Sequence, residues 1–223
     1  MNNIPDLEGP EFGPAAGGAA QQLIVFVHGY GADGNDLIGL APHFADLMPN
    51  AKFVSPNAPY PCEGSPFGYQ WFRLTERTEP EMLSGARTAQ PILEKFINVQ
   101  LTAAGLQDRN LALIGFSQGT MISLFTGLRR EHPMAGILGY SGRLVGPEAL
   151  AAEISVRPSV VLVNGDADEL IPADQQTKAL NALQGAAVPV EGHIRPGLGH
   201  SIDEAGVDIG RQFMARIFGL QAP

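Results

Sequence analysis

Short apolar runs alternate with longer amphipathic stretches along most of this 223-residue chain. The runs are continuously apolar for the most part, which is typical of strands buried on both faces of a sheet. They are LIVFV (23–27), KFVSP (52–56), LALIGF (111–116), GILGYS (136–141), VVLVNG (160–165) and VPVEGHI (188–194). Helical spacing of apolar residues marks 36–48, 81–104, 119–131, 173–184 and 203–218. The alternation predicts an α/β fold with one mostly parallel sheet and helices on both faces.

The alternation is not interrupted by an internal repeat or a linker, so we expect a single domain over residues 1–223. The first 20 residues are rich in Gly, Ala and Pro and predict an arm or a lead-in strand. Pro91 lies inside the second helical stretch and should start or kink a helix there. The irregular stretch 57–78 is too short for a large cap domain, and a loop of this length is usually functional.

Charge and cysteine content exclude several kinds of site. The net charge of −9, with no stripe of Lys and Arg, disfavours nucleic-acid binding. The single cysteine, Cys62, rules out a disulfide within the chain and a zinc site built on paired cysteines. The longest purely apolar run, 23–27, is too short to span a membrane, and the N-terminus does not resemble a secretory signal. We therefore expect a cytoplasmic protein without a membrane span, and leave its oligomeric state open, a homodimer included.

The segment Gly115-Phe116-Ser117-Gln118-Gly119 matches the pattern G-x-S-x-G. It stands between an expected strand and an expected helix, where such a motif makes a tight elbow that projects the serine above the sheet. The positive end of the following helix favours negative charge beside the serine. This context predicts that Ser117 is a nucleophile rather than part of a plain glycine-rich turn.

A serine nucleophile needs a base, and an acid that orients the base. In α/β-hydrolases the order along the chain is Ser, then Asp or Glu, then His. His200 lies in a glycine-flanked loop before the last helix and is the expected base, whereas His193 lies in an expected strand and is interpreted as structural. Asp166, Asp168 and Glu169 all follow the strand 160–165, and composition does not choose between the two aspartates.

Acyl transfer also needs backbone N–H groups that stabilise the developing oxyanion. Gln118, directly after the serine, should supply one, and Tyr30, in the loop after the strand 23–27, is the candidate for the other. The same loop matches G-x-G-x-x-G over residues 29–34. A dinucleotide site would require an acid at the end of the next strand, which instead ends in Ser-Pro-Asn, so we expect no nucleotide cofactor.

Five ordered blocks resemble the phospholipase/carboxylesterase family, which includes acyl-protein thioesterases. They are HGYGADGND (28–36), APYP…WF (58–72), GFSQG (115–119), GDADELIP (165–172) and GHS (199–201). The resemblance implies a compact α/β-hydrolase with a Ser-Asp-His triad. It implies that Asp168 is the catalytic acid and that Tyr30 and Gln118 form the oxyanion hole. It also favours a place for Trp71 on the wall of the acyl site rather than in the core.

The expected function is that of a serine carboxylesterase that uses no cofactor or metal and acts on a small ester or thioester. An acyl-protein thioesterase or lysophospholipase is the alternative, and a non-catalytic binding module is disfavoured because all three triad residue types occur in order. A dienelactone-type hydrolase would carry cysteine in place of Ser117. Arg73 and Tyr30 depart from the family pattern near the expected entrance, where they should make it narrower and more polar. We therefore expect short to medium acyl chains to be preferred.

Overall fold

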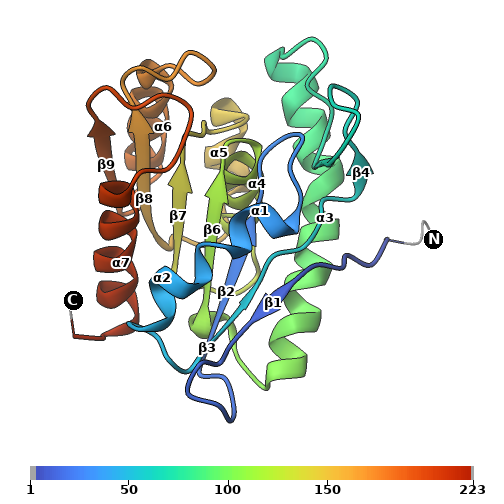
Figure 1. Cartoon of the computed structure of the whole chain (residues 1–223). Helices are drawn as coiled ribbons and strands as arrows, with labels where there is room; N and C mark the ends of the chain where they lie inside the picture. Colours follow the sequence, from blue (N-terminus) through green and yellow to red (C-terminus); the bar gives the residue numbers. More distant parts are fainter. Residues whose placement is uncertain (1–3, 222–223) are drawn as a thin grey trace.

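A seven-stranded sheet forms the centre of this computed structural model, which describes residues 4–221 (Figure 1). The spatial order of its strands is β1-β3-β2-β6-β7-β8-β9, and β1 alone pairs antiparallel, at the edge. The strands are β1 (Glu11–Phe12), β2 (Gln22–Val27), β3 (Ala51–Val54), β6 (Leu111–Phe116), β7 (Gly136–Tyr140), β8 (Ser159–Gly165) and β9 (Val190–Arg195). The expected mostly parallel sheet is confirmed.

Helices cover both faces of the sheet and bury a separate core on each (Figure 1). One face carries α1 (Gly34–Ile38), α2 (Ala41–Ala45) and α7 (Glu204–Phe218). The other carries α3 (Glu79–Ala104), α4 (Gln118–Gly127), α5 (Pro147–Glu153) and α6 (Ala173–Gly185). In β2, Ile24 and Phe26 face the core under α1, α2 and α7. Leu23, Val25 and Val27 face the core under α3, α4, α5 and α6. Successive side chains of a strand point to opposite faces, so burial on both sides requires the continuous apolar runs seen in the sequence.

Several elements differ from the sequence expectation. The stretch 36–48 forms two short helices, because α1 ends at Gly39 and α2 begins beside a proline. The helix α3 continues through Pro91 instead of starting there, since Ile92 and Leu93 are buried in the core and their packing offsets the lost hydrogen bond. The irregular stretch contains a small hairpin of β4 (Tyr60–Pro61) and β5 (Tyr69–Gln70), and a short 3-10 helix, η1, spans Asp108–Asn110.

The order of the strands determines where a site can form. The chain crosses outward from β2 to β3 and then returns to place β6 on the other side of β2. The loops after β2 and β6 therefore diverge at the carboxyl edge of the sheet, the position at which open α/β sheets bind ligands. No helix within residues 4–221 is long and apolar enough to cross a membrane.

Candidate active site

Ser117 occupies the turn between β6 and α4, above the carboxyl edge of the sheet. Its backbone has φ 53° and ψ −117°, a conformation that is rarely populated by a residue with a side chain. The Ser117 N–H donates to the carbonyl of Tyr140 at 2.9 Å, which ties the elbow to the neighbouring strand β7. The strained turn exposes the serine hydroxyl in front of the first turn of α4.

The two glycines of the motif are required by close backbone contacts. A Cβ on Gly119 would lie 1.7 Å from the carbonyl oxygen of Val27 in β2, and one on Gly115 would lie 2.6 Å from the backbone of Gly119. Both distances are shorter than any contact that a side chain can make. The tight elbow is therefore possible only with glycine at these positions, as the sequence pattern predicted.

His200 stands between Ser117 and Asp168. Its Nε2 atom is 2.9 Å from Ser117 Oγ, and its Nδ1 atom is 2.8 Å from Asp168 Oδ2. A carboxylate can only accept, so Nδ1–H donates to Asp168 and Nε2 is left to accept the proton of the serine hydroxyl. The Phe116 ring packs against the imidazole, with ring centroids 4.9 Å apart.

The two aspartates of the turn after β8 have different surroundings. Asp168 is 4% exposed, and its Oδ1 accepts hydrogen bonds from the backbone N–H groups of Leu170 and Ile171. Asp166 is exposed, and its Oδ1 accepts from the Gly197 N–H at 2.6 Å. The first aspartate is thus aimed at His200, whereas the second ties the loop that carries His200 to the turn after β8.

Two backbone donors flank the serine. Among the residues described, the backbone N–H of Tyr30 and that of Gln118 make no hydrogen bond to another backbone group. The Gln118 side chain is buried and used elsewhere: its Oε1 accepts from the Trp71 N–H at 2.9 Å, and its Nε2 donates to the Phe72 carbonyl at 2.7 Å. No sequence pattern predicted these two bonds, which hold the first residue of α4 against the backbone of Trp71 and Phe72.

His28 holds the loop after β2 through both nitrogens of its ring. The Ala58 N–H donates to its Nε2 at 2.9 Å, and its Nδ1 donates to the Gly29 carbonyl at 2.8 Å. Burial lowers the pKa of His28, because the charged form would lose its solvation, and this outweighs the opposing effects of its bond to Gly29 and of the charges of Asp33 and Asp36. The neutral ring therefore ties the loop after β2 to the segment at Ala58.

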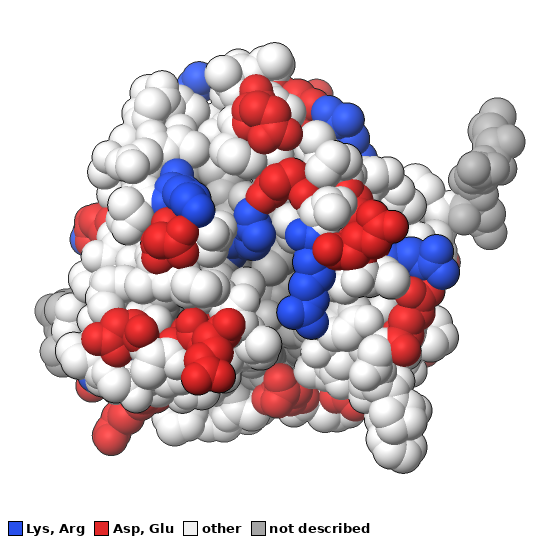
Figure 2. Space-filling model, turned by 90° about the horizontal axis from the view of Figure 1, so that it is seen from above, with Lys and Arg blue, Asp and Glu red and all other residues white. Residues whose placement is uncertain are grey.

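The cavity beside Ser117 is small, at about 240 Å³. Figure 2 shows the face on which the site opens, with basic and acidic side chains around a depression near its middle. Leu74 and Arg77 belong to the irregular stretch 57–78, which therefore forms part of the rim. The lining residues are Gly29, Tyr30, Ala32, Asp36, Leu74, Arg77, Met82, Phe116, Ser117, Met121, Arg143, Leu170, Ile171 and His200.

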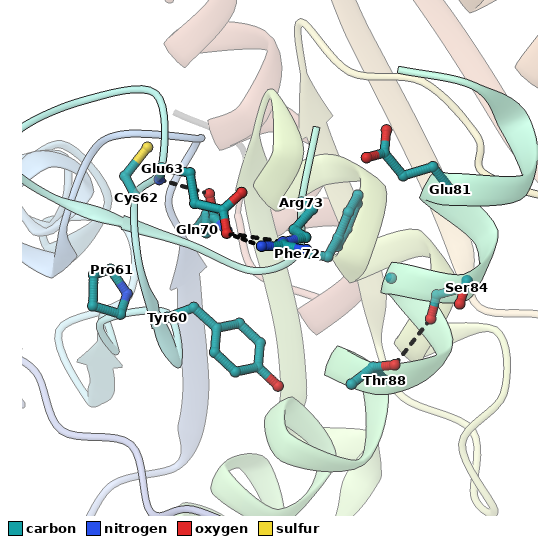
Figure 3. Close-up of a pocket in the computed structure, with 11 residues that line it drawn as sticks. Tyr60, Pro61, Cys62, Glu63, Gln70, Phe72, Arg73, Glu81, Ser84 and Thr88 are labelled. Carbon is teal, nitrogen blue, oxygen red and sulfur yellow. Dashed lines mark hydrogen bonds and ion pairs between the residues drawn. The ribbon is translucent and has the colours of Figure 1, made fainter. Parts of the chain in front are cut away.

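The expectation for Trp71 is wrong. Its side chain is fully buried and does not line the cavity, because Nε1–H donates to the carbonyl of His28 at 3.0 Å and the ring packs in the core. Arg73 does not reach that cavity either. It lines a neighbouring one of about 690 Å³ between the β4–β5 hairpin and α3, where it pairs with Glu63 at 2.7 Å (Figure 3). Of the two departures from the family pattern, Tyr30 alone borders the serine cavity.

Several lining residues carried no signal in the sequence. Met82, Met121 and Arg143 come from α3, α4 and the loop after β7, and none belongs to a recognisable motif. Apolar residues at helical spacing are interpreted as core by default, and a lone arginine as surface. The packing of distant segments was needed to find them.

Comparisons with known proteins show what this chain is similar to. The family model described as phospholipase/carboxylesterase matches residues 14–217. The chain is 30% identical to "Esterase YpfH" of Escherichia coli over 185 residues, which cover 82% of this chain and 78% of that protein. It is 25% identical to "Acyl-protein thioesterase 1" of Gibberella zeae over 195 residues, covering 80% and 83%. Among solved structures, esterase PE8 superposes with a TM-score of 0.91 at 42% identity, covering 96% of this chain and 100% of the other.

Proposed function

The chain belongs to the phospholipase/carboxylesterase family, and we propose that it hydrolyses carboxylic esters through an acyl-enzyme formed on Ser117. The observation that carries the proposal is the continuous hydrogen-bonded series of Ser117, His200 and Asp168, with separations of 2.9 and 2.8 Å. This arrangement lets an uncharged serine become a nucleophile without a metal or a cofactor.

In the first half of the reaction, Ser117 Oγ bonds to the acyl carbon while His200 Nε2 takes the hydroxyl proton. Asp168 stabilises the imidazolium that results. The carbonyl oxygen becomes an oxyanion and accepts hydrogen bonds from the backbone N–H groups of Tyr30 and Gln118. Each such hydrogen bond raises the rate by a factor on the order of 10²–10³. The ester C–O bond then breaks, and His200 returns the proton to the departing alcohol.

The second half repeats this chemistry with water. His200 Nε2 removes a proton from a water molecule, whose oxygen bonds to the acyl carbon, and the same two N–H groups hold the oxyanion. The bond to Ser117 Oγ breaks, and the serine regains its proton from His200. The carboxylic acid leaves and the free enzyme is restored.

The cavity favours short to medium acyl groups. Its volume of about 240 Å³ is below the roughly 300–1,000 Å³ of sites that enclose drug-sized ligands. Its apolar lining of Leu74, Met82, Met121 and Leu170 can stabilise an acyl chain by about 0.8 kcal/mol per buried methylene until the space is filled. We expect kcat/KM to rise over the first few carbons and then level or fall.

The test combines labelling with a chain-length series. A fluorophosphonate should label the protein on one serine, and Ser117→Ala should lose both labelling and hydrolysis while its melting temperature stays near that of the wild type. Ser201→Ala is the matched control, because Ser201 adjoins His200 but is exposed and outside the proposed triad. A mutant of Ser117 that still labels would contradict the nucleophile. A steady rise of kcat/KM out to palmitoyl esters or thioesters would favour the alternative of an acyl-protein thioesterase or lysophospholipase.

A further inference from the structure

Two arginines border the serine cavity, although the chain as a whole carries a net charge of −9. Arg77 precedes α3, and Arg143 follows β7, so two distant segments place a guanidinium at the same cavity. We propose that these arginines make the enzyme selective for esters that carry a free carboxylate, in the acyl or the alcohol part. This proposal rests on the esterase function proposed above.

Arg77 is held at the rim by its backbone rather than by an ion pair. Its φ of 56° lies in the left-handed region, which is uncommon for a residue with a side chain. The Glu81 carboxylate fixes this turn by accepting the backbone N–H groups of Glu76 and Arg77, at 2.9 and 2.7 Å. Within residues 4–221 the Arg77 guanidinium makes no ion pair. The Glu81 carboxylate binds backbone N–H groups instead, which leaves the guanidinium free.

Arg143 is only partly satisfied. One nitrogen of its guanidinium pairs with Glu79 in the first turn of α3, which anchors the side chain to the start of the helix that follows Arg77. Its Nε–H is buried and has no hydrogen-bond acceptor among the residues described. A buried donor without a partner is costly in a folded protein. The side chain as a whole is 22% exposed and borders the cavity, so a bound anion can reach its guanidinium there.

The charges around the cavity favour a carboxylate over a more highly charged group. The planar fork of a guanidinium matches the two oxygens of a carboxylate. Glu79 partly neutralises Arg143 through their ion pair. Asp36 of α1 borders the serine cavity, and together with Phe116 and His200 it also lines a second, neighbouring hollow. A single negative charge is therefore the best fit to what remains, and a dianion would be repelled by Asp36.

Paired substrates of equal chain length test the proposal. The first pair is monoethyl glutarate and ethyl pentanoate. The second pair is 4-acetoxybutyrate, the acetate ester of 4-hydroxybutyrate, and butyl acetate. In each pair a carboxylate replaces a methyl group, in the acyl part or in the alcohol part. We expect the wild type to prefer the anionic member of at least one pair, by about tenfold or more in kcat/KM, because hydrogen bonds to charged groups are strong.

Variants locate the effect. Arg77→Gln should lower the ratio of anionic to neutral kcat/KM by about tenfold or more, and Arg77→Lys should restore part of it by keeping the charge without the fork. Asp36→Asn should raise the ratio, and added salt should lower it in the wild type. Arg73→Gln is the matched control, because it removes a nearby arginine that lines the neighbouring cavity, and it should leave the ratio unchanged.

The outcomes separate this proposal from the esterase function. Hydrolysis of the neutral esters without preference in either pair, or a preference that survives Arg77→Gln, would overturn carboxylate recognition and leave the esterase intact. Failure to hydrolyse any of the four esters, by a protein with an unchanged melting temperature, would overturn the proposed function itself. Monitoring released ethanol or acid makes the readout independent of a chromophore that could itself occupy the cavity.

Discussion

Replacing Asp168 by asparagine should move the proton of the neutral His200 ring from Nδ1 to Nε2, with little change in the shape of the side chain at position 168. Asp168 Oδ1 accepts two backbone N–H groups, from Leu170 and Ile171, at 2.9 and 2.8 Å. Those donors require an oxygen at that position, so an asparagine would turn its NH₂ group toward His200. The imidazole could meet this donor only with an unprotonated Nδ1, and its proton would move to Nε2. There it would face Ser117 Oγ, and His200 could no longer accept the serine proton.

The size of the loss follows from this geometry. Forcing the wrong tautomer while keeping the site assembled costs about 10³–10⁴ in rate where a Ser-His-Asp triad operates. At 1.36 kcal/mol for each factor of ten, the barrier should rise by about 4–5.5 kcal/mol. The free energy of unfolding should change much less, since both backbone bonds to Oδ1 are kept.

Asp166→Asn is the matched control, two residues away. Asp166 is exposed, and an asparagine there retains the oxygen that accepts the Gly197 N–H. Its kcat/KM on a short soluble ester should stay within about threefold of the wild type. The fluorophosphonate labelling rate and the melting temperature should be measured on both variants. Losses of similar size in the two variants, or a loss below tenfold in Asp168→Asn with the fold intact, would refute the assignment of the acid.

Three further predictions concern residues around the site. Burial lowers the pKa of His28 below its unfolded value of about 6.5, so the unfolded chain takes up this proton first as the pH falls. The free energy of unfolding should therefore decline below about pH 6.5, by up to about 1.4 kcal/mol per pH unit from this group, and His28→Gln should flatten that decline in urea titrations at several pH values. Trp71→Phe removes the bond to the His28 carbonyl and should cost about 1–3 kcal/mol of stability, yet leave the preferred acyl chain length unchanged; a shifted chain-length optimum would return Trp71 to the cavity wall. Gly119→Ala cannot relieve its 1.7 Å contact with Val27 without moving the elbow, so it should abolish fluorophosphonate labelling, and normal labelling would contradict the steric reasoning.

Much of the architecture could be predicted because local pattern and tertiary environment agree. A strand covered on both faces needs apolar residues at every position, and β2, β6, β7 and β8 show such runs directly. The two strands of the hairpin were missed for the converse reason. The strands β4 and β5 have two residues each and no pattern of their own, so their formation depends on the partner to which they bond. The first 20 residues, in which an arm or a lead-in strand was expected, contain the short strand β1.

The residues of the candidate site also differ in how far the local sequence predicts them. The sequence by itself determined Ser117 and Gln118, since a tight strand-to-helix elbow needs glycines at fixed spacing, and it singled out His200 by its place in a loop before the last helix. Residues alone left Asp166 and Asp168 open, because both stand in one turn and differ only in direction. The tertiary structure shows which of them contacts the imidazole, since two backbone N–H groups aim Asp168 at His200.

The surroundings of the serine belong to the tertiary structure alone. Trp71 lies in a stretch of irregular pattern that fits a pocket wall or a core anchor equally, and only its bond to the His28 carbonyl places it in the core. Arg77 and Arg143 are 66 positions apart in the numbering, and no local pattern relates them, yet both border one cavity. Local sequence encodes backbone turns and burial, whereas the walls of a cavity are set by the packing of distant segments, which no short motif records.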